Sequence, residues 1–408
     1  MLSVASAPKM LGPTASHGPT ETGPAATTRQ RVLRALRDNG VMSRAALSRE
    51  TGLSASTISA LVRELARDGL VVDAGEQVPP AGQSAGRPGA GLALDPRAAA
   101  AIGIDFGFRH VRVILCDLAH RVIGTSKAEL PEHHTANVGV EVAAGLVTGL
   151  VADAALAPGT VVGAGIGVPG PINRPPGTVI PPRVLPGWEG EAAVRAFAER
   201  LGVPAAIDND ANLAALGELV WGAGRSAESF LLLKLHRGVG GAVVVDGRIM
   251  RGAAGGAGEI GHVTIDRRGA VCRCGKRGCL ETYASIPAVL AALEPTHGTI
   301  SLTELADLAR RDDPAVMRVL NDVGEIIGDT VAMVWRVLEP SKIILVGALV
   351  DATGPVLIDA VTQALIRDAS PGDRLLPDVL PGALQGQAGA LGGAALVLRE
   401  TGWLPTGP

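Results

Sequence analysis

The 408-residue sequence predicts a mixed α/β protein that carries a smaller, separate module near its N-terminus. Three observations support this prediction. Between residues 29 and 73 the apolar residues recur at helical spacing in three short bursts. Beyond residue 98, apolar strands alternate with helical segments and glycine-rich turns. Charge is also uneven, because residues 29–73 hold eight Arg against five acidic residues in a chain of net charge −3. The N-terminal module is therefore the part expected to meet a polyanion.

Composition is that of a globular protein, with 47% hydrophobic residues. The longest apolar runs, such as residues 343–350, are too short to span a bilayer, so no membrane partner is expected. Residues 1–28 lack the apolar core of a signal peptide and are predicted to be a disordered tail. Four cysteines, three of them within residues 272–279, do not suggest a disulfide framework and favour a reducing cytoplasm.

The three helical bursts fit a helix-turn-helix over residues 29–75. Ser43 and Ser54 are predicted to cap the two helices of the motif, and Gly52 supplies the turn between them. The stripe of Ile58, Leu61, Val62 and Leu65 falls at i, i+3, i+4 and i+7 and packs inward. The outer face of the second helix of the motif keeps small polar residues and one arginine, as a helix that enters the major groove does. The predicted DNA contacts are Ser54, Ala55, Ser56, Thr57, Ser59 and Arg63. A three-helix protein-interaction bundle is the alternative, and the basic excess favours DNA.

Residues 76–97 are predicted to be a wing or a linker. An apolar strand lies at each end of this region, and its middle is rich in Gly, Pro, Ser and Gln, which suits the two-stranded wing of a winged helix. Arg87 either reaches a phosphate or the minor groove, or caps the wing. A flexible linker between domains fits the same composition.

Two lobes are expected after the linker, over residues 98–212 and 213–408. Residues 101–118 form a strand, a turn with Asp105 and Gly107, and a second strand. This Asp-x-Gly turn is typical of the actin-like sugar kinases, in which the aspartate handles magnesium and backbone N–H groups hold phosphate. A later strand delivers Asn209 and Asp210 to the start of a helix. A carboxylate beside an amide suits proton acceptance from a sugar hydroxyl, and a helix-capping aspartate is the equal alternative.

A compact metal site is predicted in the second lobe. One His and three Cys offer four N/S ligands, which close a tetrahedral structural zinc site with no open position. These ligands are His262, Cys272, Cys274 and Cys279. Buried thiols or a redox pair are the alternatives. Zinc here would fix the nearby carboxylates of Glu259 and Glu281, which together with Asn209 and Asp210 are a set suited to sugar hydroxyls.

These motifs resemble the ROK family of repressors, open reading frames and sugar kinases. Residues 272–281 match its C-x-C-G-x-x-G-C-x-E signature, residues 259–262 its E-x-G-H, and residues 209–218 its N-D-A-N-x-A-A-L-G-E element. Residues 167–171 and 186–188 resemble its G-x-P-G-P and P-G-W loops. The resemblance is to the repressor branch. It implies an actin-like (ribonuclease H-like) two-lobe fold, a homodimer or possibly a tetramer, and zinc on the four ligands above. It also implies sugar binding by Asn209, Asp210, Glu259, His262 and Glu281.

The phosphate loops depart from the pattern of the family's kinases. In the first loop Phe108 and Arg109 replace a Gly and a Thr, and in the second His236 and Arg237 do the same. On the adenosine side Val346 replaces the first Gly of a Gly-Gly pair. Bulky side chains obstruct the close approach of phosphate to backbone, although Arg109 and Arg237 could themselves pair with phosphate. The residues that remain for nucleotide phosphate are Asp105, Gly107, Gly238 and Gly240.

The sequence therefore predicts a regulator that binds a double-stranded DNA operator and responds to a sugar or sugar derivative, without phosphorylating it. Repression is favoured by the resemblance alone. The alternative is an active ATP-dependent hexose kinase of the glucokinase type with an added DNA-binding arm, in which Asp210 is the catalytic base. A third hypothesis is a constitutive DNA-binding protein with a vestigial sugar pocket.

Overall fold

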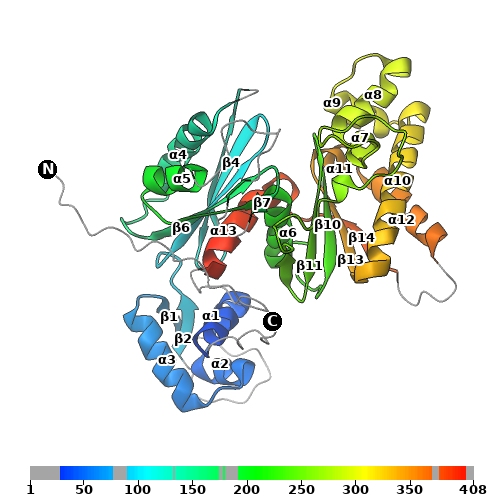
Figure 1. Ribbon diagram of the computed structural model, residues 1–408. Helices are drawn as coiled ribbons and strands as arrows, with labels where there is room; N and C mark the ends of the chain where they lie inside the picture. The colour runs from blue at the N-terminus through cyan, green and yellow to red at the C-terminus, as the bar shows by residue number, and fades with distance from the viewer. Residues whose placement is uncertain are drawn as a thin grey trace.

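The computed structural model describes residues 28–76, 90–131, 134–173, 178–179, 192–369 and 376–400. Within these residues the N-terminal module joins a body of two lobes, each built on a five-stranded sheet (Figure 1).

The N-terminal module has the predicted winged helix-turn-helix architecture. It contains α1 (Thr28–Asn39), α2 (Arg44–Thr51), α3 (Ala55–Arg67) and the antiparallel strands β1 (Val71–Glu76) and β2 (Ala90–Leu94). The hydroxyls of Ser43 and Ser54 accept the backbone N–H groups that begin α2 and α3, at 3.2 and 3.1 Å. Gly52 adopts a positive φ of 66° between the two helices, which favours glycine. The predicted caps and turn are thus confirmed, while Arg87 lies outside the described residues.

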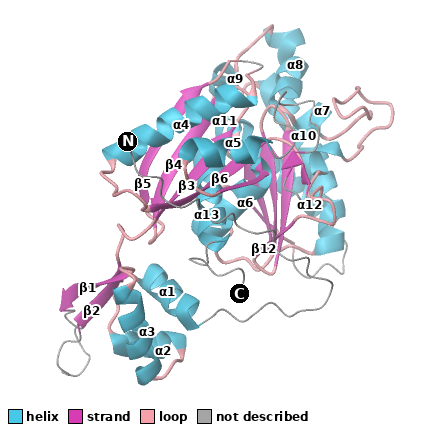
Figure 2. Cartoon of the chain, turned by 60° about the vertical axis from the view of Figure 1, so that its left-hand side comes forward, coloured by secondary structure: helices cyan, strands magenta, loops and turns pink. Residues whose placement is uncertain are grey.

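The first lobe contains a sheet of strand order β5-β4-β3-β6-β9. Its strands are β3 (Ala100–Phe106), β4 (His110–Asp117), β5 (Val122–Glu129), β6 (Val161–Val168) and β9 (Ala205–Asn209). The strands β3, β6 and β9 run parallel, and β4 and β5 continue the sheet antiparallel. The helices α4 (Ala136–Asp153) and α5 (Ala192–Leu201) cover one face (Figure 2). A short pair, β7 (Ile172–Asn173) and β8 (Thr178–Val179), lies beside the sheet.

Helix α4 is, among the described residues, the one helix long and apolar enough by composition to cross a bilayer. Its buried residues, which include Val140, Ala143 and Val147, belong to the hydrophobic core under the first sheet. The helix that covers a sheet in a globular protein has this same composition, so its hydropathy is explained by that packing.

The second lobe contains a sheet of order β12-β11-β10-β13-β14. Its strands are β10 (Phe230–Leu235), β11 (Val239–Val245), β12 (Arg248–Met250), β13 (Lys342–Val346) and β14 (Asp378–Pro381). Alternate residues of β10 enter different cores: Leu231 and Leu233 face the outer helices, whereas Phe230 and Leu232 face the other lobe. The outer helices are α7 (Glu281–Ala284), α8 (Ile286–His297), α9 (Leu302–Ala309), α10 (Pro314–Leu338), α11 (Ala348–Thr353) and α12 (Pro355–Asp368).

Between the two sheets lie α6 (Asp210–Trp221) and the last helix, α13 (Ala388–Glu400), as Figure 1 shows. Glycines allow the backbones of α6 and α13 to come into direct contact. A Cβ on Gly217 of α6 would lie 2.3 Å from the carbonyl oxygen of Ala388, and one on Gly392 of α13 would lie 1.7 Å from that of Leu213. Helix α13 thus packs on the first sheet and α6. The boundaries predicted for the domains stay predictions.

The N-terminal module shares a hydrophobic core with the body. One continuous cluster of buried side chains includes Val32 and Leu36 of α1, Leu216 of α6 and Leu398 of α13. Its apolar residues are removed from water on both sides of the junction, which makes burial the main attraction between module and body.

We predict that Gly217→Ala destabilises the protein. The added methyl group overlaps the Ala388 carbonyl, and overpacking of this kind costs about 1–3 kcal/mol, more than the roughly 1 kcal/mol that Ala gains over Gly in a helix. Gly145→Ala in α4 is the matched control, because a Cβ there meets nothing within 4 Å and should stabilise the protein. Urea denaturation measures both. Equal stabilisation by the two changes would contradict the close contact.

Candidate functional site

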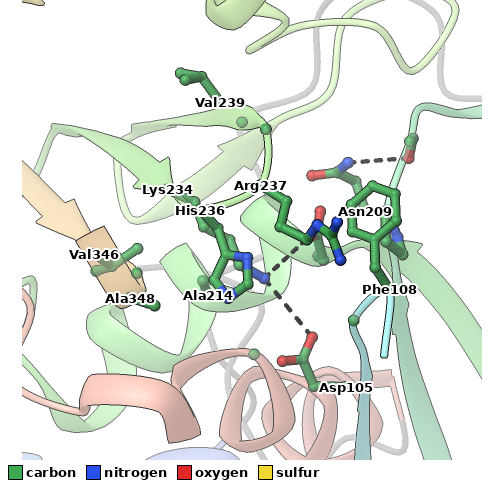
Figure 3. Close-up of a pocket in the computed structure, with 18 of the residues that line it drawn as sticks. Asp105, Phe108, Asn209, Ala214, Lys234, His236, Arg237, Val239, Val346 and Ala348 are labelled. Carbon is green, nitrogen blue, oxygen red and sulfur yellow. Dashed lines mark hydrogen bonds and ion pairs between the residues drawn. The ribbon is translucent and has the colours of Figure 1, made fainter. Parts of the chain in front are cut away.

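A pocket of about 590 Å³ lies between the two lobes, a volume in the range of small-molecule sites (Figure 3). The first lobe contributes Asp105 and Asn209 to its wall, and the second contributes Lys234 and Glu259. All five predicted sugar-binding residues line it: Asn209, Asp210, Glu259, His262 and Glu281.

Asn209 is the last residue of β9 and the N-cap of α6. Its side-chain oxygen accepts the backbone N–H groups of Ala211 and Asn212, at 2.9 and 3.1 Å, and its amide nitrogen donates to the carbonyl of Gly170 at 3.0 Å. The helix cap is therefore Asn209 and not Asp210, whose carboxylate lines the pocket. This arrangement fixes the position of the predicted base at the first turn of a helix, where the dipole favours an anion.

Lys234 lies at the centre of the pocket and was not singled out from the sequence. Its ammonium group is 2.8 Å from Asp210 Oδ2 and 3.9 Å from Asp105 Oδ1 (Figure 3). Burial alone would lower the pKa of Lys234, but the charges of Asp105 and Asp210 outweigh it and raise that pKa. Lys234 is therefore a cation at neutral pH. The sequence does contain a signal for this residue, since Lys234 interrupts the apolar strand FLLLKL. A lysine buried in such a strand requires an anionic partner, which indicates a charged site.

The two glutamates predicted to bind sugar line the pocket and have different contacts. Glu281 is 7% exposed, accepts the backbone N–H of Val239 at 3.1 Å and forms an ion pair with Arg273. Glu259 lies 3.8 Å from the imidazole Nε2 of His262, and burial raises the pKa of its carboxyl group. Glu281 was predicted to bind a sugar hydroxyl, and one of its carboxylate oxygens is thus already bound by Arg273.

The predicted metal ligands come together in space. One donor atom from each of His262, Cys272, Cys274 and Cys279 lies within 4.8 Å of every other. The Cys272 sulfur is 3.5 Å from His262 Nδ1, and the sulfurs of Cys274 and Cys279 are 3.6 Å apart. A soft donor set of one nitrogen and three sulfurs in this arrangement fits a metal ion held by the protein alone. The fourth cysteine, Cys116, is buried in β4, as expected for a core residue.

Side chains fill the space around the two loops that the sequence resemblance assigned to nucleotide phosphate. The imidazole of His110 covers Gly107, so that a Cβ on that glycine would lie 2.3 Å from the ring. The guanidinium of Arg237 lies 5.8 Å from the centre of the Phe108 ring, within cation–π range. His236, Gly238 and Gly240 line the same pocket; Arg109 is not among the lining residues. Phe108 of the first loop and Arg237 of the second, which both differ from the kinase pattern, are therefore in contact with each other across the pocket.

His110 and His236 are neutral at pH 7. Burial, with the charge of Lys127 for His110 and of Lys234 for His236, lowers the pKa of each to about 4. Each neutral ring offers one N–H donor and one acceptor to a ligand.

The predicted DNA-contacting residues are accessible on α3. Ser54, Ala55, Ser56 and Arg63 are exposed, and Thr57 and Ser59 are half-buried. The hydroxyl of Ser54 lies 2.8 Å from those of Ser56 and Thr57, and Arg63 Nε donates to the Ser59 carbonyl at 3.2 Å. Small polar groups at the N-terminal end of an exposed helix, with an arginine two turns on, can enter a major groove.

Comparison with known proteins gives a family for each part. The chain matches the ROK family over residues 101–400 and a winged helix-turn-helix DNA-binding family over residues 26–72. The xylose repressor of Bacillus spizizenii is 30% identical over 370 residues, which are 90% of this chain and 94% of that protein. The glucokinase of Halalkalibacterium halodurans is 31% identical over 329 residues, 73% of this chain and 95% of that enzyme.

A solved structure is similar over almost the whole chain. The crystal structure of a ROK family transcriptional regulator, described as a homologue of the E. coli Mlc protein, superposes with a TM-score of 0.75 at 25% identity. The similarity covers 92% of this chain and 96% of that one. The predicted fold, an actin-like two-lobe body of the ROK sugar kinase type after a winged helix, is confirmed.

We predict that Cys274→Ser lowers both the metal content and the stability of the protein. The change removes one thiolate from the tetrad, and a metal that holds its loop contributes folding free energy directly. Elemental analysis of protein purified without chelator, with thermal unfolding before and after chelation, measures the effect. Cys116→Ala is the control and should keep its metal, since Cys116 is outside the tetrad. A metal content far below one per chain in the unaltered protein would show that the tetrad holds none.

Proposed function

The chain belongs to the ROK family and carries an N-terminal winged helix-turn-helix, and from this premise we propose that it is a sugar-responsive transcriptional repressor of the cytoplasm. The body binds a sugar or a sugar derivative between its lobes. The winged helix binds operator DNA, and a homodimer places two recognition helices on half-sites about one helical turn or a multiple apart.

The contacts of Lys234 favour a sensor over a kinase. Phosphoryl transfer needs Asp105 free to handle magnesium and Asp210 free to accept the hydroxyl proton. Lys234 forms ion pairs with both carboxylates and supplies the positive charge that magnesium would bring. The side chains of Phe108, His110 and Arg237 lie where nucleotide phosphate would approach the backbone. The alternative, an active hexose kinase, requires all of these groups to withdraw.

We assign the metal in the tetrad as structural zinc. Zinc prefers four N/S ligands in a closed tetrahedral site, and when bound it ties the segment after His262 to the segment that ends at Glu281. Arg273 lies between two of the cysteine ligands, so the loop also holds the guanidinium that engages Glu281. The zinc loop in this way positions one wall of the sugar pocket.

Helix α6 connects the pocket with the DNA-binding module. It begins at the Asn209 cap in the pocket and ends at Trp221, whose indole N–H donates to the carbonyl of His120 at 2.9 Å. The two rings are 5.1 Å apart. Burial, together with the charges of Arg37 and Arg399, lowers the pKa of His120 to about 3. Arg37 belongs to α1 of the module, so His120 lies at the junction between module and body.

Helix α13 makes a second connection. Its first residues, Ala388 and Gly389, line the pocket, and Arg399 in its last turn is a close charged neighbour of Arg37. Because α6 and α13 are in backbone contact, a displacement at their pocket ends is carried along both helices to α1.

The first test is operator binding by the purified protein, with DNA from its own upstream region, across a panel of sugars and sugar phosphates. We expect one of them to change the DNA affinity 5- to 150-fold without ATP, as a coupling of about 1–3 kcal/mol gives, and to cause no ADP release. Fluorescence anisotropy and a coupled ADP assay measure the two properties. Sugar-dependent ADP release would establish the kinase, and tight DNA binding indifferent to every compound would favour a vestigial pocket.

Arg63→Gln serves as the control for that experiment. It should weaken operator binding and reduce its salt dependence, because an arginine that meets DNA displaces counterions, and it should leave the affinity for the sugar unchanged. Arg311→Gln, an exposed arginine of the second lobe, should change neither property.

We predict that Trp221→Leu uncouples the pocket from the DNA. The change removes the indole from His120 at the far end of α6 and leaves every pocket residue in place. The effect of the effector on operator affinity should fall by about 2- to 30-fold, while the affinity for the effector alone stays the same. Trp335→Leu in α10 controls for the loss of a tryptophan side chain. Full coupling in Trp221→Leu would exclude this route.

A further inference from the structure

Two cations and an imidazole stand together on the face of the first sheet that lines the pocket. The register of the strands places Arg112 of β4 between Asp105 of β3 and Lys127 of β5. His110 precedes Arg112 by two residues and therefore shares its face. Arg112, Lys127 and His110 all line the pocket. None of the three belongs to the motifs that assigned the sugar site.

Their positive charge has no partner among the described residues. The Nε of Arg112 is buried and makes no hydrogen bond, and neither Arg112 nor Lys127 forms an ion pair there. The neighbouring Asp105 forms its ion pair with Lys234 at 3.9 Å. Burial raises the pKa of the Asp105 carboxyl group, and the charges of Lys234 and Arg112 oppose that rise, so Arg112 attracts this carboxylate without forming an ion pair with it. After the larger effect of burial, the charges of Lys127, Lys234 and Arg112 lower the pKa of His110 further. This end of the pocket is therefore positive, and an anion there would be favoured.

The positive end is continuous with the sugar end. Lys234 contacts Asp105 on one side and Asp210 on the other, so a single side chain separates the two regions. A ligand whose ring lies against Asn209 and Asp210 has room to extend a substituent to the Arg112 region, because both regions line one pocket of about 590 Å³.

We propose that the effector is a sugar phosphate, with its ring hydroxyls bound by the polar residues of the sugar end and its phosphate bound by Arg112, Lys127 and the N–H of His110. The proposal rests on the proposed function and narrows its ligand class. A neutral sugar would leave the positive charge of Arg112 and its buried Nε without an anionic partner, whereas a phosphate monoester accepts several charge-assisted hydrogen bonds at once. A nucleoside triphosphate fits less well, because His110 covers Gly107 and Arg237 stacks on Phe108.

The test compares matched pairs of a sugar and its phosphate monoester by calorimetry on the full-length protein, with inorganic phosphate and ATP as separate arms. We expect the monoester of one pair to bind about 10- to 100-fold more tightly than its parent sugar, as one or two charge-assisted contacts give. Arg112→Gln and Lys127→Gln should each reduce that preference and leave the affinity for the parent sugar within about twofold. Lys127 is exposed, so its replacement does not threaten folding. Arg200→Gln, which removes an exposed cation of the same lobe paired with Glu141, should change nothing.

The outcomes separate this proposal from the proposed function. If a parent sugar binds as tightly as its phosphate and still shifts operator affinity, the protein is a sugar-responsive regulator but the proposal of a sugar-phosphate effector is wrong. If inorganic phosphate or ATP binds as tightly as any sugar phosphate, the positive end serves a free anion or a nucleotide, and the proposal is overturned. If no compound of either class binds, the proposed function fails together with it.

Discussion

The backbone contact of α13 with α6 and with the first sheet is the constraint on which the rest of the structure depends. A Cβ on Gly103 of β3 would lie 1.7 Å from the carbonyl of Ala390, and one on Gly165 of β6 would lie 2.0 Å from that of Gly393. Together with the contacts of Gly217 and Gly392, these leave no room for α13 to move independently of its neighbours. The same rigid unit forms the floor of the pocket and the surface against which α1 packs. Pocket and DNA-binding module therefore share one support.

Charge within the pocket is balanced by the chain itself. Lys234 forms ion pairs with Asp105 and Asp210, and Arg273 forms one with Glu281. Of the carboxylates predicted to bind sugar or magnesium, only Glu259 lacks a contact with a lysine or arginine among the described residues. Buried charges need such partners. A ligand that hydrogen-bonds to Asp210 and Glu281 meets carboxylates that Lys234 and Arg273 already engage through one oxygen each, Oδ2 and Oε2. Such a ligand regulates only when it binds one arrangement of these ion pairs better than another.

Local patterns could be predicted from the sequence, and contacts between distant segments could not. The caps at Ser43 and Ser54 depend on a few neighbouring residues, and the spacing of the cysteines indicated the metal tetrad. The choice between Asn209 and Asp210 as helix cap could not be made, because either side chain can accept the same N–H groups. The proximity of Phe108 to Arg237 and of Arg112 to Lys127 depends on lobe closure and strand register, which no local pattern contains.

At the junction with the DNA-binding module, apolar side chains attract one another while neighbouring arginines repel. Arg37, Arg251 and Arg399 are close enough for the charges of the other two to lower the pKa of Arg399 to about 10, after the larger effect of burial. Arg251 is also bound to Asp208, whose other oxygen accepts the backbone N–H of Asn209. A movement of Asn209 that disturbs Asp208 would alter the position of Arg251 and so the repulsion that Arg251 exerts on Arg399, the charged neighbour of Arg37. Since regulation requires only about 1–3 kcal/mol, a modest change in the spacing of like charges at a partly buried junction is of sufficient size.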